Sequence, residues 1–197
     1  GCSINALLLA AWIACASRLS ASSDVVVGCE LDGRRHTELA SALGPLARTL
    51  PIHSALSPEI RFSELTTAAQ RSVSEATNWQ ESFTWTQVTD THDPVLPLVF
   101  SSTEMIEEVD VDGLRFGLEQ IWVVSESYEL KLNVVRRGDE WKLEFHYDRS
   151  RLSQAAVERI AGYYQTLLAA AVASPETAIA RLPLLAEKER QQILVDW

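Results

Sequence analysis

The sequence lacks most features of a metal-binding, disulfide-linked or membrane-spanning protein. It has three cysteines in 197 residues, with no C-x-x-C pair and no histidine at ligand spacing. We therefore expect neither a structural zinc site nor a disulfide framework, and a reducing cytoplasm fits this composition. Residues 4–19 are mostly apolar but too short to cross a bilayer, and Asn5, Ser17 and Arg18 interrupt them. They also lack the basic start and cleavage pattern of a signal peptide, so we interpret them as a buried helix.

Positive charge is also scarce. The chain has 17 Lys and Arg against 27 Asp and Glu, which gives a formal net charge of −10. This balance argues against a nucleic acid or an anionic membrane surface as the partner. A solvated acidic surface is the simpler interpretation.

Recognisable catalytic motifs are missing. The glycines are scattered, and none forms a phosphate-binding loop between a strand and a helix. No serine occupies a nucleophile elbow. The four histidines, His36, His53, His92 and His146, are far apart, and none belongs to a nucleophile, metal or acid–base motif. We expect His146 to point outward from a strand as an ordinary surface residue. The residues themselves predict no catalytic group and no metal site.

The strongest pattern that is present covers residues 128–173 and predicts a β-hairpin followed by a long helix. Residues 128–135 and 141–147 alternate between apolar and polar side chains, which is typical of half-buried strands. The apolar side chains expected to face inward are Leu130, Leu132, Val134, Trp141, Leu143, Phe145 and Tyr147. Gly138 supplies the turn between the strands, and Ser153 is positioned to cap the helix. The helix stripe comprises Val157, Ile160, Ala161, Tyr164, Leu168 and Ala171.

The other predicted elements surround this unit. The apolar run 25–29 predicts a strand buried on both faces. Ser63 can cap a helix over 64–79, residues 98–100 and 116–124 read as strands, and the chain closes with a short helix over 187–197. Helices and buried strands in this order predict an α/β layered fold.

Three segments resemble the C-terminal lobe of nonribosomal peptide synthetase condensation domains. Residues 5–12, 24–28 and 32–34 resemble the helix, strand and "GR" turn of that family. Residues 43–53, LGPLARTLPIH, resemble its "GpfvNTLPlR" motif. Residues 182–190 with 194–197 resemble its closing "LPLLtxxErxxLLxxWN".

The resemblance implies a fold and a set of site residues. The expected fold is α/β: a single lobe of the chloramphenicol-acetyltransferase-like (CoA-dependent acyltransferase) fold, with a mixed β-sheet covered by α-helices. Residues 1–181 would form the lobe, and residues 182–197 a tail towards a following adenylation domain. The motif residues near the family's substrate tunnel are Gly44, Pro45, Arg48 and Thr49, and Arg48 replaces the family's usual Asn. The tail residues expected to contact a neighbouring domain are Leu184, Leu185, Glu189, Leu194 and Trp197, with Leu185 and Trp197 packing the tail.

The chain also departs from the family. No two histidines are adjacent, so the catalytic "HHxxxDG" motif is absent from these 197 residues. The later "HQDxPFE" motif corresponds at best to residues 78–83, without its proline, and the "RDxSRNPL" motif is unrecognisable.

These departures favour a truncated, non-catalytic condensation domain that acts as an adaptor or docking surface. The neighbouring adenylation, carrier or condensation domains would be its partners. The acidic side chains Glu104, Glu107, Glu108, Asp110 and Asp112 could complement a basic partner or simply be solvated. The alternative is the C-terminal half of an active domain whose histidine motif lies in another lobe; a free-standing trimeric acyltransferase is the weakest hypothesis. In each case we expect no cofactor on this chain, with phosphopantetheine carried by a partner carrier domain.

Overall fold

The computed structural model describes residues 1–34, 36–92, 94–105, 108–119, 127–186 and 189–192. The chain divides into two compact units, each assembled from separate stretches of sequence. Unit 1 comprises Gly1–Val27, Pro51–Trp79 and Arg149–Trp197, and unit 2 comprises Gly28–Leu50 and Gln80–Asp148. The division into a lobe over 1–181 and a tail over 182–197 stays a prediction.

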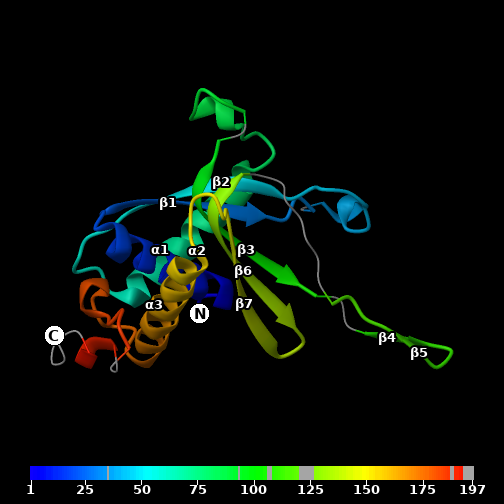
Figure 1. The fold of residues 1–197 in the computed structure, drawn as a ribbon. Helices are drawn as coiled ribbons and strands as arrows, with labels where there is room; N and C mark the ends of the chain where they lie inside the picture. Colours follow the sequence, from blue (N-terminus) through cyan, green and yellow to red (C-terminus); the bar gives the residue numbers. More distant parts are fainter. Residues whose placement is uncertain (35, 93, 106–107, 120–126, 187–188, 193–197) are drawn as a thin grey trace. The chain divides into compact units, whose positions relative to one another are not determined.

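Helices dominate unit 1, whereas strands dominate unit 2 (Figure 1). The helices are α1 (Ile4–Ser20), α2 (Phe62–Trp79) and α3 (Gln154–Ala173). The strands are β1 (Asp24–Leu31), β2 (Arg48–Ala55), β3 (Leu96–Glu104), β4 (Val109–Val111), β5 (Leu114–Phe116), β6 (Tyr128–Arg137) and β7 (Glu140–Tyr147). Short 3₁₀ turns occupy Thr37–Leu39, Trp85–Gln87 and Ile179–Arg181.

Helix α1 is the centre of unit 1 and packs against α2 and α3. It begins where the Ser3 side chain accepts a hydrogen bond from the Ala6 amide, and it ends at Ala21, whose φ of 50° is left-handed. Nine of its side chains are buried: Ala6, Leu8, Leu9, Ala10, Ala11, Trp12, Ile13, Ala14 and Cys15. The prediction of a buried helix is confirmed.

Two aromatic residues join α1 to α3. The rings of Trp12 and Tyr164 meet edge to face with centroids 5.8 Å apart. The Tyr164 hydroxyl donates to the Leu8 carbonyl at 3.1 Å, which satisfies the one polar atom of a fully buried ring. Ser153 caps α3 as predicted. The prediction that Leu168 is a core residue of the stripe is wrong, because Leu167 is fully buried and Leu168 only half-buried.

The start of α2 also differs from the prediction. Ser63 lies inside the helix, which begins at Phe62. The first amides of α2 are satisfied by backbone instead, since Phe62 donates to the Thr177 carbonyl and Ser63 to the Pro175 carbonyl. A distant segment therefore performs the task that the sequence pattern assigned to a local side chain.

Five strands form one mixed sheet in the order β2-β1-β3-β6-β7. Strands β1, β3 and β6 are parallel neighbours, whereas β6 and β7 form the predicted antiparallel hairpin. Gly138 turns that hairpin with a φ of 57°, as expected for a glycine at this position. The predicted α/β class with a mixed sheet is confirmed.

The burial of the sheet corrects three predictions. Strand β6 is covered on both faces, since Lys131 and Asn133 are each only 8% exposed. Trp141, predicted to face inward, is 39% exposed near the hairpin turn, where the Arg136 guanidinium lies over its ring. In β1, Val27 is buried as predicted but Val26 is 48% exposed.

The segment before β6 differs as well. Strand β3 is longer than the predicted 98–100. The strand predicted over 116–124 is wrong at its start, because β5 ends at Phe116 and residues 117–119 are not strand. Residues 120–124 lie outside the described residues. Strands β4 and β5 pair only with each other, as a separate two-stranded ribbon.

Candidate functional site

The predicted motif 43–53 spans a loop and strand β2 in the structure. Gly44 has a φ of 138°, which strongly favours glycine, and its carbonyl accepts a hydrogen bond from Arg34 Nη2 at 3.0 Å. The same nitrogen donates to the Ala42 carbonyl at 3.2 Å. The arginine of the "GR" turn thus holds the loop of the second motif.

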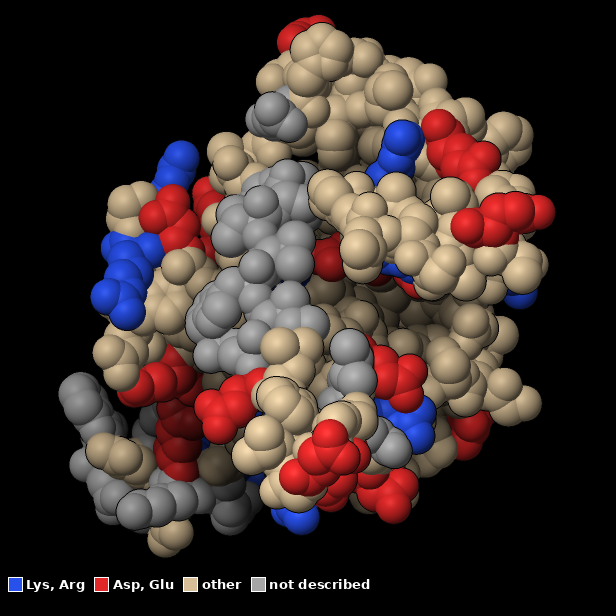
Figure 2. All heavy atoms as spheres, turned by 90° about the vertical axis from the view of Figure 1, so that its right-hand side faces the viewer, with Lys and Arg blue, Asp and Glu red and all other residues tan. Residues whose placement is uncertain are grey.

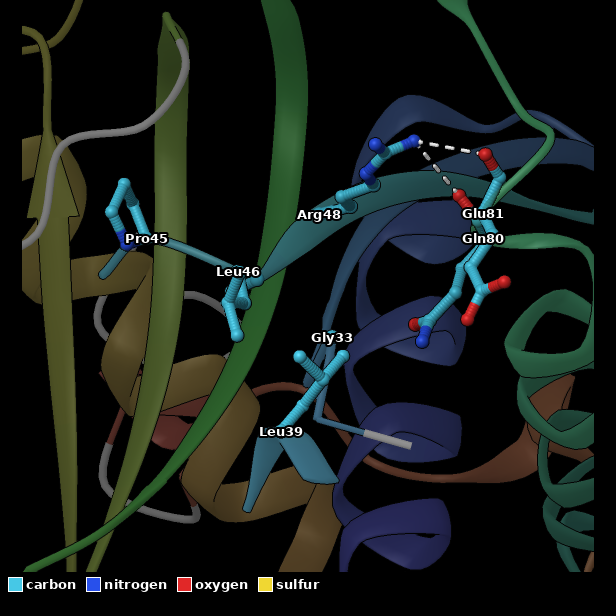
Figure 3. Close-up of a pocket in the computed structure, with 8 residues that line it drawn as sticks. Gly33, Leu39, Pro45, Leu46, Arg48, Gln80 and Glu81 are labelled. Atoms are coloured by element: carbon cyan, nitrogen blue, oxygen red, sulfur yellow. Dashed lines mark hydrogen bonds between the residues drawn. The ribbon is translucent and has the colours of Figure 1, made fainter. Parts of the chain in front are cut away.

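A pocket of about 250 Å³ lies beside this loop within unit 2 (Figure 3). It is lined by Gly33, Leu39, Pro45, Leu46, Ala47, Arg48, Gln80 and Glu81, and we call it the Gln80 pocket. A side chain at Gly33 would collide with the Leu46 backbone carbonyl, so this wall needs glycine. Of the four predicted motif residues, Pro45 and Arg48 line the pocket, whereas Gly44 and the buried Thr49 do not.

Arg48 is held by backbone rather than by an acidic side chain. Its Nη1 donates to the carbonyl oxygens of Gln80 and Glu81 at 3.2 and 3.3 Å (Figure 3). These carbonyls directly follow the end of α2 in sequence. The cation at the family's asparagine position therefore fixes one wall of the pocket.

Gln80 is a residue that the sequence reasoning missed. It is 1% exposed, and its Nε2 donates to the Asp32 carbonyl at 3.1 Å. Its Oε1 atom is buried and has no hydrogen-bond partner in the described part of the chain. Periodicity could not identify it, because it follows the end of α2 in a segment without regular structure.

A second polar cluster lies within the sheet of unit 2. Lys131 Nζ donates to Glu30 Oε2 at 2.6 Å, and both side chains are mostly buried. Nearby on the same face, the Asn133 amide donates to Glu144 Oε2 at 3.2 Å. His146, predicted to be a surface residue, is instead 17% exposed at its side chain and lies 3.2 Å from the same Glu144 oxygen.

The electrostatics of this cluster follow from burial and hydrogen bonding. Burial by itself would raise the pKa of Glu144, but hydrogen bonds from Lys142, Asn133 and His146 outweigh it and lower that pKa. Burial, together with the Glu30 carboxylate, raises the pKa of Tyr128. The cluster thus favours a charged Glu144.

The described residues contain no evident catalytic or metal centre. His36 and His53 form exposed pairs with Glu81 and Asp24, each at 3.1 Å. Burial raises the pKa of the Cys15 and Cys29 thiols to about 12, which keeps them protonated and poorly nucleophilic. Among the residues placed in the structure, no group of three His, Cys, Asp or Glu side chains could hold a metal ion.

The predicted acidic surface coincides with the β4–β5 ribbon, and much of its charge is paired. Arg115 lies 3.7 Å from both Glu108 and Asp110, and Arg136 lies 3.6 Å from Glu104. Asp112 is in the exposed turn with a φ of 50°, and Glu107 lies outside the described residues. On the face drawn in Figure 2, acidic side chains are prominent and basic ones fewer.

The opposite face of the ribbon is apolar and exposed, which the sequence reasoning also missed. In the antiparallel register Val109 pairs with Phe116, and Val111 with Leu114, so all four side chains share one face. They are 52%, 58%, 50% and 64% exposed respectively. We call these four residues the apolar ribbon face. Four large apolar side chains side by side are unusual on a solvated surface.

The predicted tail is anchored through residues that differ from those predicted. Arg18 Nη1 donates to the Ile179 and Leu182 carbonyls at 2.8 and 2.9 Å, and the Leu182 side chain is 2% exposed. Leu184 and Leu185 are only half-buried, and Glu189 lies 3.4 Å from the Tyr163 hydroxyl. Leu194 and Trp197 lie outside the described residues.

The architecture defines the class: an α/β fold of the CoA-dependent acyltransferase type, shared with solved condensation domains. The chain gives a TM-score of 0.78 with the four-domain nonribosomal peptide synthetase AB3403, at 17% identity over 96% of this chain and 16% of that one. It gives 0.76 with the X-domain in the complex of the X-domain and OxyB from teicoplanin biosynthesis, at 22% identity over 95% of this chain and 44% of that one.

The condensation-domain family profile matches residues 1–194, and the chain belongs to that family. It is 27% identical to a linear gramicidin synthase of Brevibacillus parabrevis over the whole of this chain and 3% of that protein. It is 22% identical to gramicidin S synthase 2 of Aneurinibacillus migulanus, of which it covers 5%. The chain therefore spans only a small part of the curated relatives it matches. No helix in the described ranges is both long and apolar enough to span a membrane.

Proposed function

We propose that this lobe is a non-catalytic docking module of a nonribosomal peptide synthetase. The observation that carries the proposal is the apolar ribbon face, where four large side chains are at least half exposed. Such a face gains free energy when a partner removes it from water, because association buries apolar area. The paired charges on the other side of the ribbon give that partner a polar rim to recognise.

The remaining features are consistent with docking rather than chemistry. The 197 residues contain no adjacent histidines, and the buried thiols have raised pKa values. A solved relative of this fold was captured in a complex with another protein, OxyB. The proposed partners are carrier, condensation and adenylation domains of the same synthetase. Phosphopantetheine would be carried by the carrier domain, and the assembly would work in the cytoplasm on peptide antibiotic biosynthesis.

Titration of the ¹⁵N-labelled lobe with each neighbouring domain tests this function. We expect chemical-shift changes concentrated in residues 108–118 with at least one domain. A Leu114→Asp/Phe116→Asp variant should weaken that binding by about tenfold or more, because charge on a buried contact face opposes association. The matched control is Val172→Asp, since Val172 is 57% exposed on α3 and outside the ribbon. Absence of shifts with every domain would overturn the proposal.

The second candidate is the C-terminal half of an active condensation domain. It is favoured by coverage, since 92–94% of this chain matches 42–47% of several solved condensation domains. On this hypothesis the apolar ribbon face would contact a lobe that carries the histidine motif. Combining the chain with such a lobe and measuring the amide product from carrier-bound substrates by mass spectrometry separates the two. Product formation would overturn the non-catalytic assignment.

A further inference from the structure

The buried amide oxygen of Gln80 is a hydrogen-bond acceptor that lacks a donor. Gln80 Nε2 is committed to the Asp32 carbonyl, which fixes the orientation of the amide. Turning the amide over would place two oxygen acceptors together, because a carbonyl has no proton to donate. The Oε1 atom is therefore held where no donor of the described chain reaches it.

Such an atom is exceptional in a folded protein. A buried carbonyl oxygen without a hydrogen bond loses the water that solvates it in the unfolded chain and gains nothing in return. Most buried acceptors are consequently paired with protein or with ordered water. A donor from outside the chain, either water or a ligand group, would complete Gln80.

The space beside Gln80 suits a small group. The Gln80 pocket has a volume of about 250 Å³, below the range of about 300–1,000 Å³ typical of complete ligand sites. Its apolar wall consists of Leu39, Pro45, Leu46 and Ala47. Figure 3 shows the Arg48 guanidinium near one end of the drawn group and the Gln80 amide near the other. One chain end fits this space better than a whole cofactor.

The charges around the pocket select the chemistry of that chain end. Arg48 opposes a cationic group, whereas the Glu81 carboxylate and Gln80 Oε1 oppose an anionic one. A neutral group with one donor and one acceptor matches an acceptor at Gln80 and a guanidinium donor at Arg48. The secondary amide is the simplest such group.

We propose that the Gln80 pocket binds the end of a neutral chain that carries a secondary amide, whose N–H donates to Gln80 Oε1. This inference does not depend on the docking function, because the pocket residues and the apolar ribbon face share no member. It assigns a recognition role to a residue that belongs to no family motif as an acceptor.

A matched pair of small amides tests the proposal on the unaltered protein. N-methylacetamide has an amide N–H, and N,N-dimethylacetamide has the same carbonyl without it. In titrations followed by ¹H–¹⁵N spectra, the first should shift the Gln80 side-chain amide and the Gly33 amide. It should bind about fivefold more tightly than the second, as expected for one hydrogen bond. Equal affinities, or no shifts at Gln80, would overturn the proposal.

A variant pair connects the preference to the oxygen atom. Gln80→Met removes the acceptor at similar volume, and the preference for the N–H compound should disappear. Gln165→Met makes the same change at an exposed position of α3 and should retain the preference. Thermal unfolding of both variants checks that they fold, and a preference that survives Gln80→Met contradicts the assignment.

Two natural sources of such an amide are separated by larger probes. N-acetylglycine methylamide represents a peptide chain, and pantetheine represents a carrier arm. Binding of either one at the Gly33 and Gln80 amides supports the proposal and identifies the source. Binding of neither, together with an ordered water on Oε1 in a crystal structure, would show that Gln80 is satisfied by solvent alone and would overturn the proposal.

Discussion

Units 1 and 2 place their apolar and polar side chains in opposite ways. In unit 1 the nine buried residues of α1 and the Trp12–Tyr164 pair form an apolar interior. In unit 2 an ion pair and an asparagine–glutamate hydrogen bond lie within the sheet, while the apolar ribbon face is exposed. Unit 1 therefore uses apolar area for folding, whereas unit 2 keeps apolar area available for association.

The largest expected effect is the loss of the α1 aromatic. Trp12→Ala should reduce the free energy of unfolding by about 3–5 kcal/mol, because it leaves a cavity beside Tyr164 and loses a buried ring. Urea unfolding measures this. Ile4→Ala in the same helix is the control, since Ile4 is 54% exposed and should cost far less. Similar losses for the two variants would contradict the assignment of α1 as the core.

The ion pair in the sheet should come next. Lys131→Met leaves Glu30 mostly buried without its partner and should cost about 2 kcal/mol, less than for a fully buried pair because Glu30 is 21% exposed. A Glu30→Met/Lys131→Met double variant should recover most of this loss, since no charge is then left unpaired. If the double variant were as unstable as the single one, packing rather than charge would explain the effect.

The lowered pKa of Glu144 predicts a pH dependence in unit 2. A carboxyl whose pKa is lower in the folded than in the unfolded chain stabilises the fold at pH values above its ordinary pKa. That contribution should disappear as the pH falls below about 4.5, the ordinary value. Unfolding measured from pH 6 to pH 3 should show a smaller loss for Glu144→Gln than for the unaltered chain. Glu140→Gln, at the exposed start of the same strand, is the control.

The smallest expected effect on stability is at the ribbon. Phe116→Asp should change the free energy of unfolding by less than about 0.5 kcal/mol, because the side chain is already 58% exposed. Urea unfolding checks this beside the partner titration. A loss comparable to that of Trp12→Ala would mean that the ribbon contributes to folding, and the contrast between the units would fail.

The predictability of the structure follows the range of the interactions. Ser153, Gly138 and the hairpin were predictable because capping and turn formation involve neighbours in sequence. The burial of Lys131 was not, since its partner Glu30 is 101 residues away. The pattern of alternating polar residues looked like a solvated face, although it encodes pairs across the sheet.

The candidate sites show the same limit. The motif around Pro45 and Arg48 could be located by its resemblance, and the structure places both residues at a pocket. Gln80 could not, because its importance arises from burial and an unsatisfied atom rather than from its type. The apolar ribbon face was hidden among acidic residues that dominated the pattern of 104–112.

Arg18 gives the connection between α1 and residues 179–182 a mechanical meaning. Its guanidinium holds the backbone at two points, Ile179 and Leu182, to the most buried helix of unit 1. Tension on the residues after Leu182 would thus reach α1 directly before it could peel α3 away. Arg18 would act as a strain relief, so that movement of the residues after Leu182 leaves the interior of unit 1 undisturbed.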